Sequence, residues 1–273
     1  MKHRFCTAVL ATGLAIAVLA PAAQADETKK GIERYREMMA DPFANPGTLY
    51  VDRGEELWKK KRGPKNASLE KCDLGLGPGV VKGAFAQLPR YFADTGRVMT
   101  MEGRILHCMV TLQGLDGKAI VKKAFSGRGV GGSEMEFLAS YVGAQSNGMK
   151  FAVKLDHPKE KEAFEVGKKL FYMRSGPFDY SCQSCHAEPG KRIRLQDLPD
   201  LTKPEDTRKT IVAWPAYRVS TESVKTMEHR LADCYRQMRM PRVGFASDAV
   251  SALNLYLAKL GEGGVIEVPA MKR

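Results

Sequence analysis

The residues with the clearest chemistry are Cys182, Cys185 and His186, which stand in the order Cys-x-x-Cys-His. This spacing is typical of c-type haem attachment, because two thiols can add to the vinyl groups of a porphyrin while the adjacent imidazole reaches the iron. A redox-active or metal-binding Cys-x-x-Cys pair is the other interpretation. Thioredoxin-like folds place that pair before a long helix, whereas Pro189 and Gly190 follow closely here. The motif therefore predicts one covalently bound haem c per chain.

Two helices are expected to frame this motif. Residues 160–174 carry apolar side chains at helix-compatible spacings, and Ser247 can cap a second helix that ends before Gly261. A helix, a haem motif and a closing helix are the outline of a class I cytochrome c domain, here over about residues 160–260. The expected fold class is therefore mainly α.

The beginning of the chain predicts export. A positively charged start and an apolar run at residues 8–20 precede a small-x-small site that ends at Ala25. We expect a signal peptide over residues 1–25, cleavage before Asp26, and a mature protein in the periplasm. The apolar run is too short to cross a bilayer, and no later stretch is long enough, so no membrane span is expected.

The composition is that of an ordinary globular protein with an excess of positive charge. Apolar residues make up 44% of the 273 residues, and Lys plus Arg exceed Asp plus Glu by 12. Such an excess fits an anionic substrate, an acidic protein partner or a basic surface exposed to solvent. Nucleic acid is not expected as a partner, because no basic run is interleaved with aromatic residues.

The front half of the chain repeats landmarks of the back half. At a separation of 113 residues the coincident pairs are Gly54 and Gly167, Leu57 and Leu170, Gly63 and Gly176, Pro64 and Pro177, Ser68 and Ser181, and Cys72 and Cys185. Thr100-Met101-Glu102 precedes Cys108 just as Thr226-Met227-Glu228 precedes Cys234. Ser133 and Glu136 can form a capping box for the front counterpart of the closing helix. The pattern predicts tandem duplicated class I cytochrome c-like domains.

The N-terminal copy is expected to have lost its haem. Leu69 stands where the back copy has its first motif cysteine, and Asp73 stands where it has the proximal histidine. The expected organisation is thus a signal peptide (1–25), an N-terminal arm (26–47), a haem-less cytochrome c-like domain (48–150) and a haem-binding domain with the active site (151–273).

The cysteines of the front copy predict a disulfide. Cys72 and Cys108 would have faced the haem position from opposite sides, and without haem they can approach each other. A disulfide that closes this loop in an oxidising compartment would stabilise the fold by roughly 3–4 kcal/mol. After removal of Cys6 with the signal peptide, the mature chain keeps an odd number of cysteines, so one sulfur atom has another role.

The distal ligand of the iron has two candidates. Met240 precedes Pro241 and a Ser-capped helix, where ordinary class I cytochromes c place an axial methionine. Cys234 is favoured by elimination among the cysteines and by the Arg-x-x-x-Cys pattern that marks both copies. A thiolate would lower the reduction potential relative to methionine, which suits a role other than routine electron transfer.

Together these features resemble the SoxA family, the catalytic subunits of SoxAX cytochromes. The resemblance covers essentially the whole mature chain and rests most specifically on Arg230-x-x-x-Cys234-x-x-Gln237-Met238-Arg239 after the haem motif. Many members carry a haem in both halves. This chain departs from that pattern at Leu69 and Asp73, and so resembles the single-haem members.

The resemblance implies an L-cysteine S-thiosulfotransferase of bacterial thiosulfate oxidation. Such an enzyme couples thiosulfate oxidatively to a cysteine of the carrier SoxYZ, works as a heterodimer with a SoxX-type cytochrome c, and passes electrons to a cytochrome c partner. The family's catalytic cysteine, a haem ligand found as a persulfide, corresponds to Cys234, and its substrate arginine corresponds to Arg230. In a helix the two lie one turn apart, so the guanidinium can hold sulfonate oxygens beside the sulfur. Arg236 and Arg239 either add positive potential or are plain surface cations.

Two other functions stay open at this point. One is a periplasmic electron-transfer cytochrome c ligated by His186 and Met240. The other is a relative of the di-haem peroxidases, which is disfavoured because only one haem site remains. An absorption and EPR spectrum of the ferric protein distinguishes thiolate ligation from methionine ligation.

Overall fold

The computed structural model describes residues 45–127, 131–193 and 196–272, together with residues 27, 30, 31, 33, 34 and 37. The chain divides into two compact units, Met1–Ala44 and Asn45–Arg273. The second unit contains both halves of the sequence that the repeat relates. The expected signal peptide lies outside the described residues, as does most of the expected arm.

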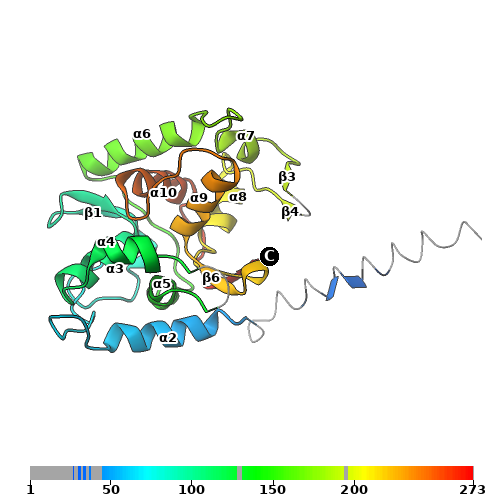
Figure 1. The fold of residues 1–273 in the computed structure, drawn as a ribbon. Helices are drawn as coiled ribbons and strands as arrows, with labels where there is room; N and C mark the ends of the chain where they lie inside the picture. Colours follow the sequence, from blue (N-terminus) through cyan, green and yellow to red (C-terminus); the bar gives the residue numbers. More distant parts are fainter. Residues whose placement is uncertain are drawn as a thin grey trace, which may run out of the picture. The chain divides into compact units, whose positions relative to one another are not determined.

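The front half of the second unit is mainly helical (Figure 1). Its elements are α2 (Thr48–Lys59), η2 (Phe85–Gln87), β1 (Arg90–Phe92), β2 (Arg97–Met99), α3 (Met101–Thr111), α4 (Gly117–Ala119), η3 (Ile120–Ala124) and α5 (Glu134–Ala144). Helices α2 and α5 pack against each other, and the contact depends on Gly54, where a Cβ atom would lie 2.1 Å from the carbonyl oxygen of Phe137. One turn further along, the rings of Trp58 and Tyr141 lie 5.9 Å apart.

The back half has the same kind of helix pair. Its elements are α6 (Pro158–Tyr172), α7 (Gln183–His186), β3 (Arg192–Ile193), β4 (Gln196–Asp197), α8 (Pro204–Ile211), β5 (Ala216–Arg218), η4 (Val219–Thr221), β6 (Ser223–Lys225), α9 (Met227–Gln237), α10 (Asp248–Leu260) and β7 (Ala270–Lys272). Helix α6 packs on α10 (Figure 1), and a Cβ atom on Gly167 would lie 2.0 Å from the carbonyl oxygen of Ala252. The rings of Phe171 and Tyr256 lie 5.5 Å apart, as Trp58 faces Tyr141 in the front pair.

A short antiparallel hairpin leads into one helix of each half. Strands β1 and β2 pair antiparallel before α3, and β5 and β6 pair antiparallel before α9, while β7 joins β5 in parallel to give the order β6-β5-β7. Each following helix begins after a threonine whose hydroxyl accepts a backbone N–H: Thr100 from Gly103 at 2.9 Å, and Thr226 from His229 at 3.3 Å. These caps satisfy N–H groups that a helix start leaves open.

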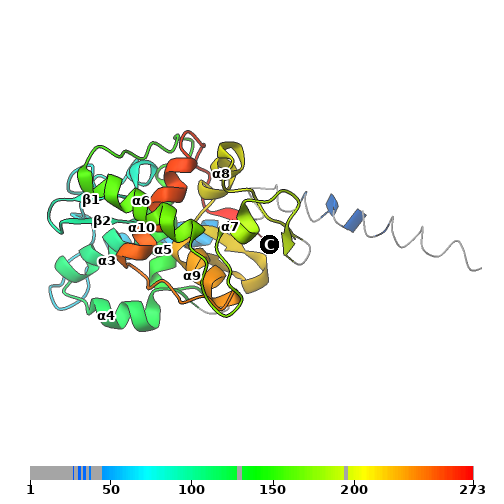
Figure 2. The same ribbon diagram turned by 90° about the horizontal axis from the view of Figure 1, so that it is seen from above.

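The two halves exchange their hairpins, and Figure 2 shows the front hairpin β1–β2 beside α6 and α10. The front hairpin β1–β2 packs on α6 and α10 of the back half, where the backbone N–H of Tyr91 donates to Glu160 at 2.9 Å. In return, Val224 of β6 is buried against Tyr50 of α2 and Phe137 of α5. The halves therefore share their cores, which explains why residues 45–273 form one compact unit.

Two buried carboxyl groups meet where the capped ends of α3 and α9 come together. The Thr100 hydroxyl donates to the carboxyl of Glu228, and the backbone N–H of Glu228 donates to Glu102 at 3.3 Å. Burial raises the pKa of both carboxyl groups. The junction between the halves therefore contains a polar contact that is sensitive to protonation.

The helices expected from the sequence are present. The helix predicted over residues 160–174 starts two residues earlier, because His157 caps it and Pro158 takes the first helical position, where a missing N–H has no cost. Ser247 caps α10, and Ser133 and Glu136 form the expected capping box of α5. The expectation of a mainly α protein is confirmed.

Candidate functional site

The Cys-x-x-Cys-His motif begins at Cys182, the N-cap residue of α7, and continues through this single helical turn, which follows a tight loop. The loop closes through a bridge between Ser175 and Tyr180, and Gly176 adopts a positive φ of 75°. A Cβ atom on Gly176 would lie 2.7 Å from the carbonyl oxygen of Arg239, so only glycine lets the loop pack on the chain that follows α9. The sequence therefore brings α7 and the end of α9 together.

His186 is oriented by a backbone contact made through one ring nitrogen. Its Nδ1 lies 3.0 Å from the carbonyl oxygen of Pro199, which fixes the proton on Nδ1 and leaves the Nε2 lone pair available as a ligand. Burial lowers the pKa of His186, and the nearby Arg230 charge lowers it further, so the imidazole is kept neutral. A neutral imidazole with a hydrogen-bonded Nδ1 is the usual form of an iron-binding histidine.

Three free thiols belong to the same site. Cys182, Cys185 and Cys234 are each partly buried and form no disulfide. Burial raises the pKa of the Cys182 thiol to about 12, and the neighbouring Cys234 adds to this rise. Burial also raises the pKa of Cys234, against the opposing positive charge of Arg230. The structure thus places Cys234 within electrostatic reach of both motif cysteines.

Helix α9 carries Arg230 and Cys234 at the expected spacing of one turn. Asp233, which sequence reasoning missed, organises the polar face of this helix. Arg236 donates to its Oδ1 at 2.6 and 3.0 Å, whereas Nη1 of Arg230 stays 3.8 Å from its Oδ2. Burial would raise the pKa of Asp233, but the Arg236 hydrogen bonds and charge outweigh it and lower that pKa. An acid placed three residues from each arginine was the available signal.

The remaining residues after α9 have defined surroundings. The guanidinium of Arg239 lies over the ring of Phe178, 5.6 Å from its centroid, so this arginine packs on the loop before the haem motif. Met240 is buried, and its backbone N–H donates to the carbonyl oxygen of Tyr235 at 2.8 Å. Met240 therefore lies in the core at the end of α9, and its role as an alternative iron ligand stays a prediction.

The donor set of the site fits a haem c. Two thiols at the thioether spacing and a histidine with a free Nε2 are its attachment groups. The hydroxyl of Tyr235 is buried with no hydrogen-bond partner among the described residues. Burial, and then the nearby Cys182 and Cys234, raise its pKa, so it is a hydroxyl donor that a polar group of a haem beside these thiols would satisfy. Across residues 45–127, 131–193 and 196–272, no three His, Cys, Asp or Glu side chains converge to hold a bare metal ion.

The corresponding place in the front half contains a disulfide. Cys72 and Cys108, both buried, are joined as the sequence predicts, with Cα atoms 5.6 Å apart. Asp73, which the sequence pattern pairs with His186, accepts from the backbone N–H groups of Gly75 at 2.7 Å and Gly77 at 3.0 Å. Its carboxylate therefore closes its own turn.

Comparison with known proteins identifies relatives of this chain. Residues 53–151 match the family model described as "SoxA/TsdA, cytochrome c domain". The chain is 46% identical to the L-cysteine S-thiosulfotransferase subunit SoxA of Hydrogenophilus thermoluteolus over the full length of both proteins. It is 36% identical to a protein of the same name from Hydrogenobacter thermophilus, over 90% of this chain and 92% of that one.

A solved structure has a similar fold. The crystal structure of SoxXA from P. pantotrophus aligns with a TM-score of 0.72 and 29% identity, over 88% of this chain and 84% of that chain. In the part of the chain that the structure describes, no helix has the length and apolar character needed to cross a membrane. Full-length similarity at 46% identity settles the family. The chain belongs to the SoxA family of L-cysteine S-thiosulfotransferase subunits, which are cytochromes c with covalently bound haem.

Proposed function

We propose that Cys234 and Arg230 are the catalytic residues with which the chain joins thiosulfate oxidatively to a cysteine of a SoxYZ-type carrier. The observation that carries the proposal is their placement one turn apart on α9, with Cys234 in electrostatic contact with the thiols of α7. A reactive sulfur, a cation for an oxyanion and a haem attachment motif thus meet in one site.

Arg230 is proposed to bind the substrate. Its side chain keeps 24% of its surface exposed, and its contact with Asp233 is long at 3.8 Å. The guanidinium therefore retains donors for the sulfonate oxygens of thiosulfate. The same charge stabilises the negative charge that collects as the new sulfur–sulfur bond forms.

Four side chains are proposed to hold the haem. Cys182 and Cys185 would form the thioether bonds, and Nε2 of His186 and the sulfur of Cys234 would bind the iron. When bound, haem supplies a cation that keeps the Cys234 sulfur deprotonated and an acceptor for one electron at a time. Because burial raises the pKa of this thiol, the polypeptide does not ionise it alone. A persulfide on Cys234 would present its terminal sulfur to thiosulfate while the ligating sulfur stays fixed.

The electrons released in the reaction require a partner protein that accepts them. Forming one sulfur–sulfur bond from thiosulfate and a carrier thiol releases two electrons and one proton, and a single haem takes one electron at a time. We therefore propose a heterodimer with a SoxX-type cytochrome c and electron transfer to a cytochrome c. The similar structure titled SoxXA supports this pairing. The segment at residues 1–25, with its signal-peptide pattern, supports a periplasmic location.

We also propose that residues 48–150 and 151–273 are duplicated cytochrome c-like domains, the first without haem. Three observations support this: the matched glycine contacts of the helix pairs, the Thr-capped helices after both hairpins, and the family match over residues 53–151. The haem loss is supported by the disulfide and by Asp73, which occupy the positions of the back-half sulfur atoms and histidine. In this proposal, the Cys72–Cys108 disulfide joins the two segments of the front half between which a haem would otherwise have been bound.

Exchange of the proposed catalytic sulfur tests the function. In Cys234→Met, we expect haem to stay attached through Cys182 and Cys185, the ferric EPR spectrum to change, and thiosulfate-dependent coupling to fall by at least about 10³-fold. The measurements are pyridine haemochrome analysis, EPR and single-turnover coupling to a carrier cysteine.

A matched variant tests the alternative ligand. Met240→Leu is expected to leave the ferric spectrum unchanged and the coupling rate within about twofold of wild type, because the proposal gives this buried methionine no role beyond packing. If Cys234→Met instead retained wild-type turnover while Met240→Leu changed the spectrum, the chain would be an electron-transfer cytochrome ligated by His186 and Met240.

A further inference from the structure

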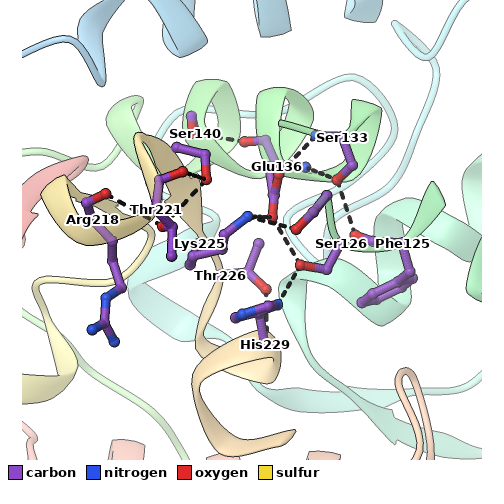
Figure 3. Close-up of polar contacts among 12 residues, drawn as sticks. Phe125, Ser126, Ser133, Glu136, Ser140, Arg218, Thr221, Lys225, Thr226 and His229 are labelled. Carbon is purple, nitrogen blue, oxygen red and sulfur yellow. Dashed lines mark hydrogen bonds and ion pairs between the residues drawn. The ribbon is translucent and has the colours of Figure 1, made fainter. Parts of the chain in front are cut away.

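A buried polar cluster connects the front half to the first turn of α9 (Figure 3). Glu136 of α5 is fully buried, and its Oε1 lies 2.9 Å from Nζ of Lys225, which is 2% exposed and ends β6. The Lys225 ammonium also donates to the carbonyl oxygen of Gly127 at 2.7 Å. A buried ion pair satisfied on both sides in this way fixes one arrangement of the elements it joins, whatever its net contribution to stability.

Ser126 extends this cluster to His229. Its hydroxyl donates to Oε1 of Glu136 at 2.8 Å, and the oxygen atom of this hydroxyl also contacts Nδ1 of His229 (Figure 3). Since a carboxylate only accepts hydrogen bonds, the hydroxyl proton of Ser126 points to Glu136. The serine oxygen can then only accept from His229, so Nδ1–H of His229 is the donor to Ser126. The contact therefore determines both the tautomer and the orientation of the imidazole.

The imidazole stays uncharged in this position. Burial lowers the pKa of His229 to about 4, and the Lys225 charge lowers it in the same direction. A neutral His229 adds no charge next to the Arg230 guanidinium. It acts as a neutral hydrogen-bonded contact between the front half and the helix that carries Arg230 and Cys234.

We infer that Ser126 and His229 are a positioning pair, through which the haem-less front half sets the first turn of α9 and thereby the direction of Arg230. This inference rests on the proposed role of Arg230 in binding thiosulfate. His229 directly precedes Arg230, so a movement of the first turn moves the guanidinium with it. Neither Ser126 nor His229 needs to touch the substrate.

Removing the hydroxyl is the first test. Ser126→Ala leaves Nδ1–H of His229 without its acceptor in a partly buried position, which loosens the turn. In the haem-loaded heterodimer we expect the KM for thiosulfate to rise about fivefold, kcat to stay within about twofold, and the ferric EPR spectrum to stay unchanged. Hydrogen exchange of the backbone amides at residues 229–231 should quicken by about tenfold, a readout that needs no turnover.

Ser140→Ala is the matched control. Ser140 is buried on α5, where its hydroxyl donates to the carbonyl oxygen of Glu136 at 2.7 Å, a hydrogen bond within that helix. It loses a buried hydrogen bond of the same kind, so its melting temperature should fall, while its KM and the exchange at residues 229–231 stay at wild-type values.

Variants of His229 test the same hydrogen bond from its other side, and they remain informative if Ser126→Ala does not fold. The amide N–H of asparagine occupies the position of Nδ1–H, so His229→Asn should keep the wild-type KM, and His229→Ala should behave like Ser126→Ala. The double variant of Ser126→Ala and His229→Ala should be no worse than either single one, because both remove one interaction.

The inference is overturned by any of three results. One is a KM that Ser126→Ala and Ser140→Ala change equally, or that neither changes. Another is a His229→Asn variant as poor as His229→Ala. The third is unchanged hydrogen exchange at residues 229–231 in Ser126→Ala. This result rejects the positioning pair independently of the proposed function, because it can be measured even if the wild-type protein does not couple thiosulfate to a carrier.

Discussion

Arg230 and Arg236 both lie on α9, but they differ in how strongly they bind the carboxylate of Asp233. Arg236 makes hydrogen bonds of 2.6 and 3.0 Å to Asp233, which engage its fork of donors, whereas Arg230 stays 3.8 Å from the same carboxylate. An arginine whose donors are already taken has less to offer an anion. The contrast supports the proposal that Arg230, rather than Arg236, binds thiosulfate.

Arg230→Ala is expected to lower kcat/KM for thiosulfate on the order of 100-fold, because a charge-assisted contact to a dianion is lost. The haem spectrum should not change, since Arg230 is not a proposed ligand. Arg230→Lys should recover only part of the loss, as an ammonium cannot make a bidentate contact. Arg97→Ala, which removes an exposed ion pair to Asp248, is the control for a lost arginine in steady-state kinetics. Wild-type kcat/KM in Arg230→Ala would contradict the assignment.

The haem motif is recognisable from the sequence because its two cysteines and histidine stand within a contiguous stretch of five residues, and the roles of these residues stay predictions. Asp233 could not be predicted, because an acid between two arginines on a helix is common on protein surfaces and only the burial of this one distinguishes it. The Glu136–Lys225 pair joins residues 89 positions apart, and nothing local marks either as a partner of the other. Contacts of this range come from tertiary packing.

At the scale of elements, each helix pair depends on a glycine at its closest approach. Gly167→Ala would place a Cβ atom 2.0 Å from the carbonyl oxygen of Ala252, a backbone atom that cannot move aside, and Gly54→Ala would do the same against Phe137. We expect each variant to lower the free energy of unfolding by about 3 kcal/mol, through forced separation of the two helices. Gly244→Ala, where the nearest atom would lie 3.8 Å away, should be close to neutral. Urea unfolding provides the comparison, and a stable Gly167→Ala would show that the pair tolerates a wider spacing.

Helix ends were more predictable than strands for a physical reason. Ser133, Ser247 and the capping-box Glu136 act within one turn, so their types and spacing suffice. The hairpin strands have three residues each, too few for an alternating pattern to emerge, and they are stabilised by the helix pair of the opposite half. Their existence depends on contacts that no local window of sequence contains.

At the scale of the molecule, the carboxyl pair between the halves gives stability a pH dependence. Burial, and then the proximity of Glu102, raise the pKa of Glu228 from 4.5 to about 8. Between these values the unfolded chain releases this proton while the folded chain retains it, so the free energy of unfolding falls as pH rises, by about 1.4 kcal/mol per unit of pKa difference. Below about pH 4.5 both states are protonated and this contribution is fully present.

Glu228→Gln removes this titration, so the fall in the free energy of unfolding between pH 5 and pH 8 should be smaller than in wild type. Urea unfolding at both pH values measures the difference, whatever the absolute stability of the variant. Glu56→Gln, which neutralises an exposed carboxyl group on α2, controls for the loss of one charge. Parallel pH profiles for wild type and Glu228→Gln would exclude the carboxyl pair as the cause.

The exchange of hairpins described above also bears on ancestry. Each helix pair is completed by the hairpin of the other half, so the link through residues 145–157 is not what keeps the halves together. Two separate copies of one such domain would trade hairpins in the same way and form a twofold-symmetric dimer. On the duplication proposed here, the expected ancestor is a swapped homodimer whose two identical subunits were joined by gene fusion, which left each half free to change while the exchanged hairpins kept the halves together.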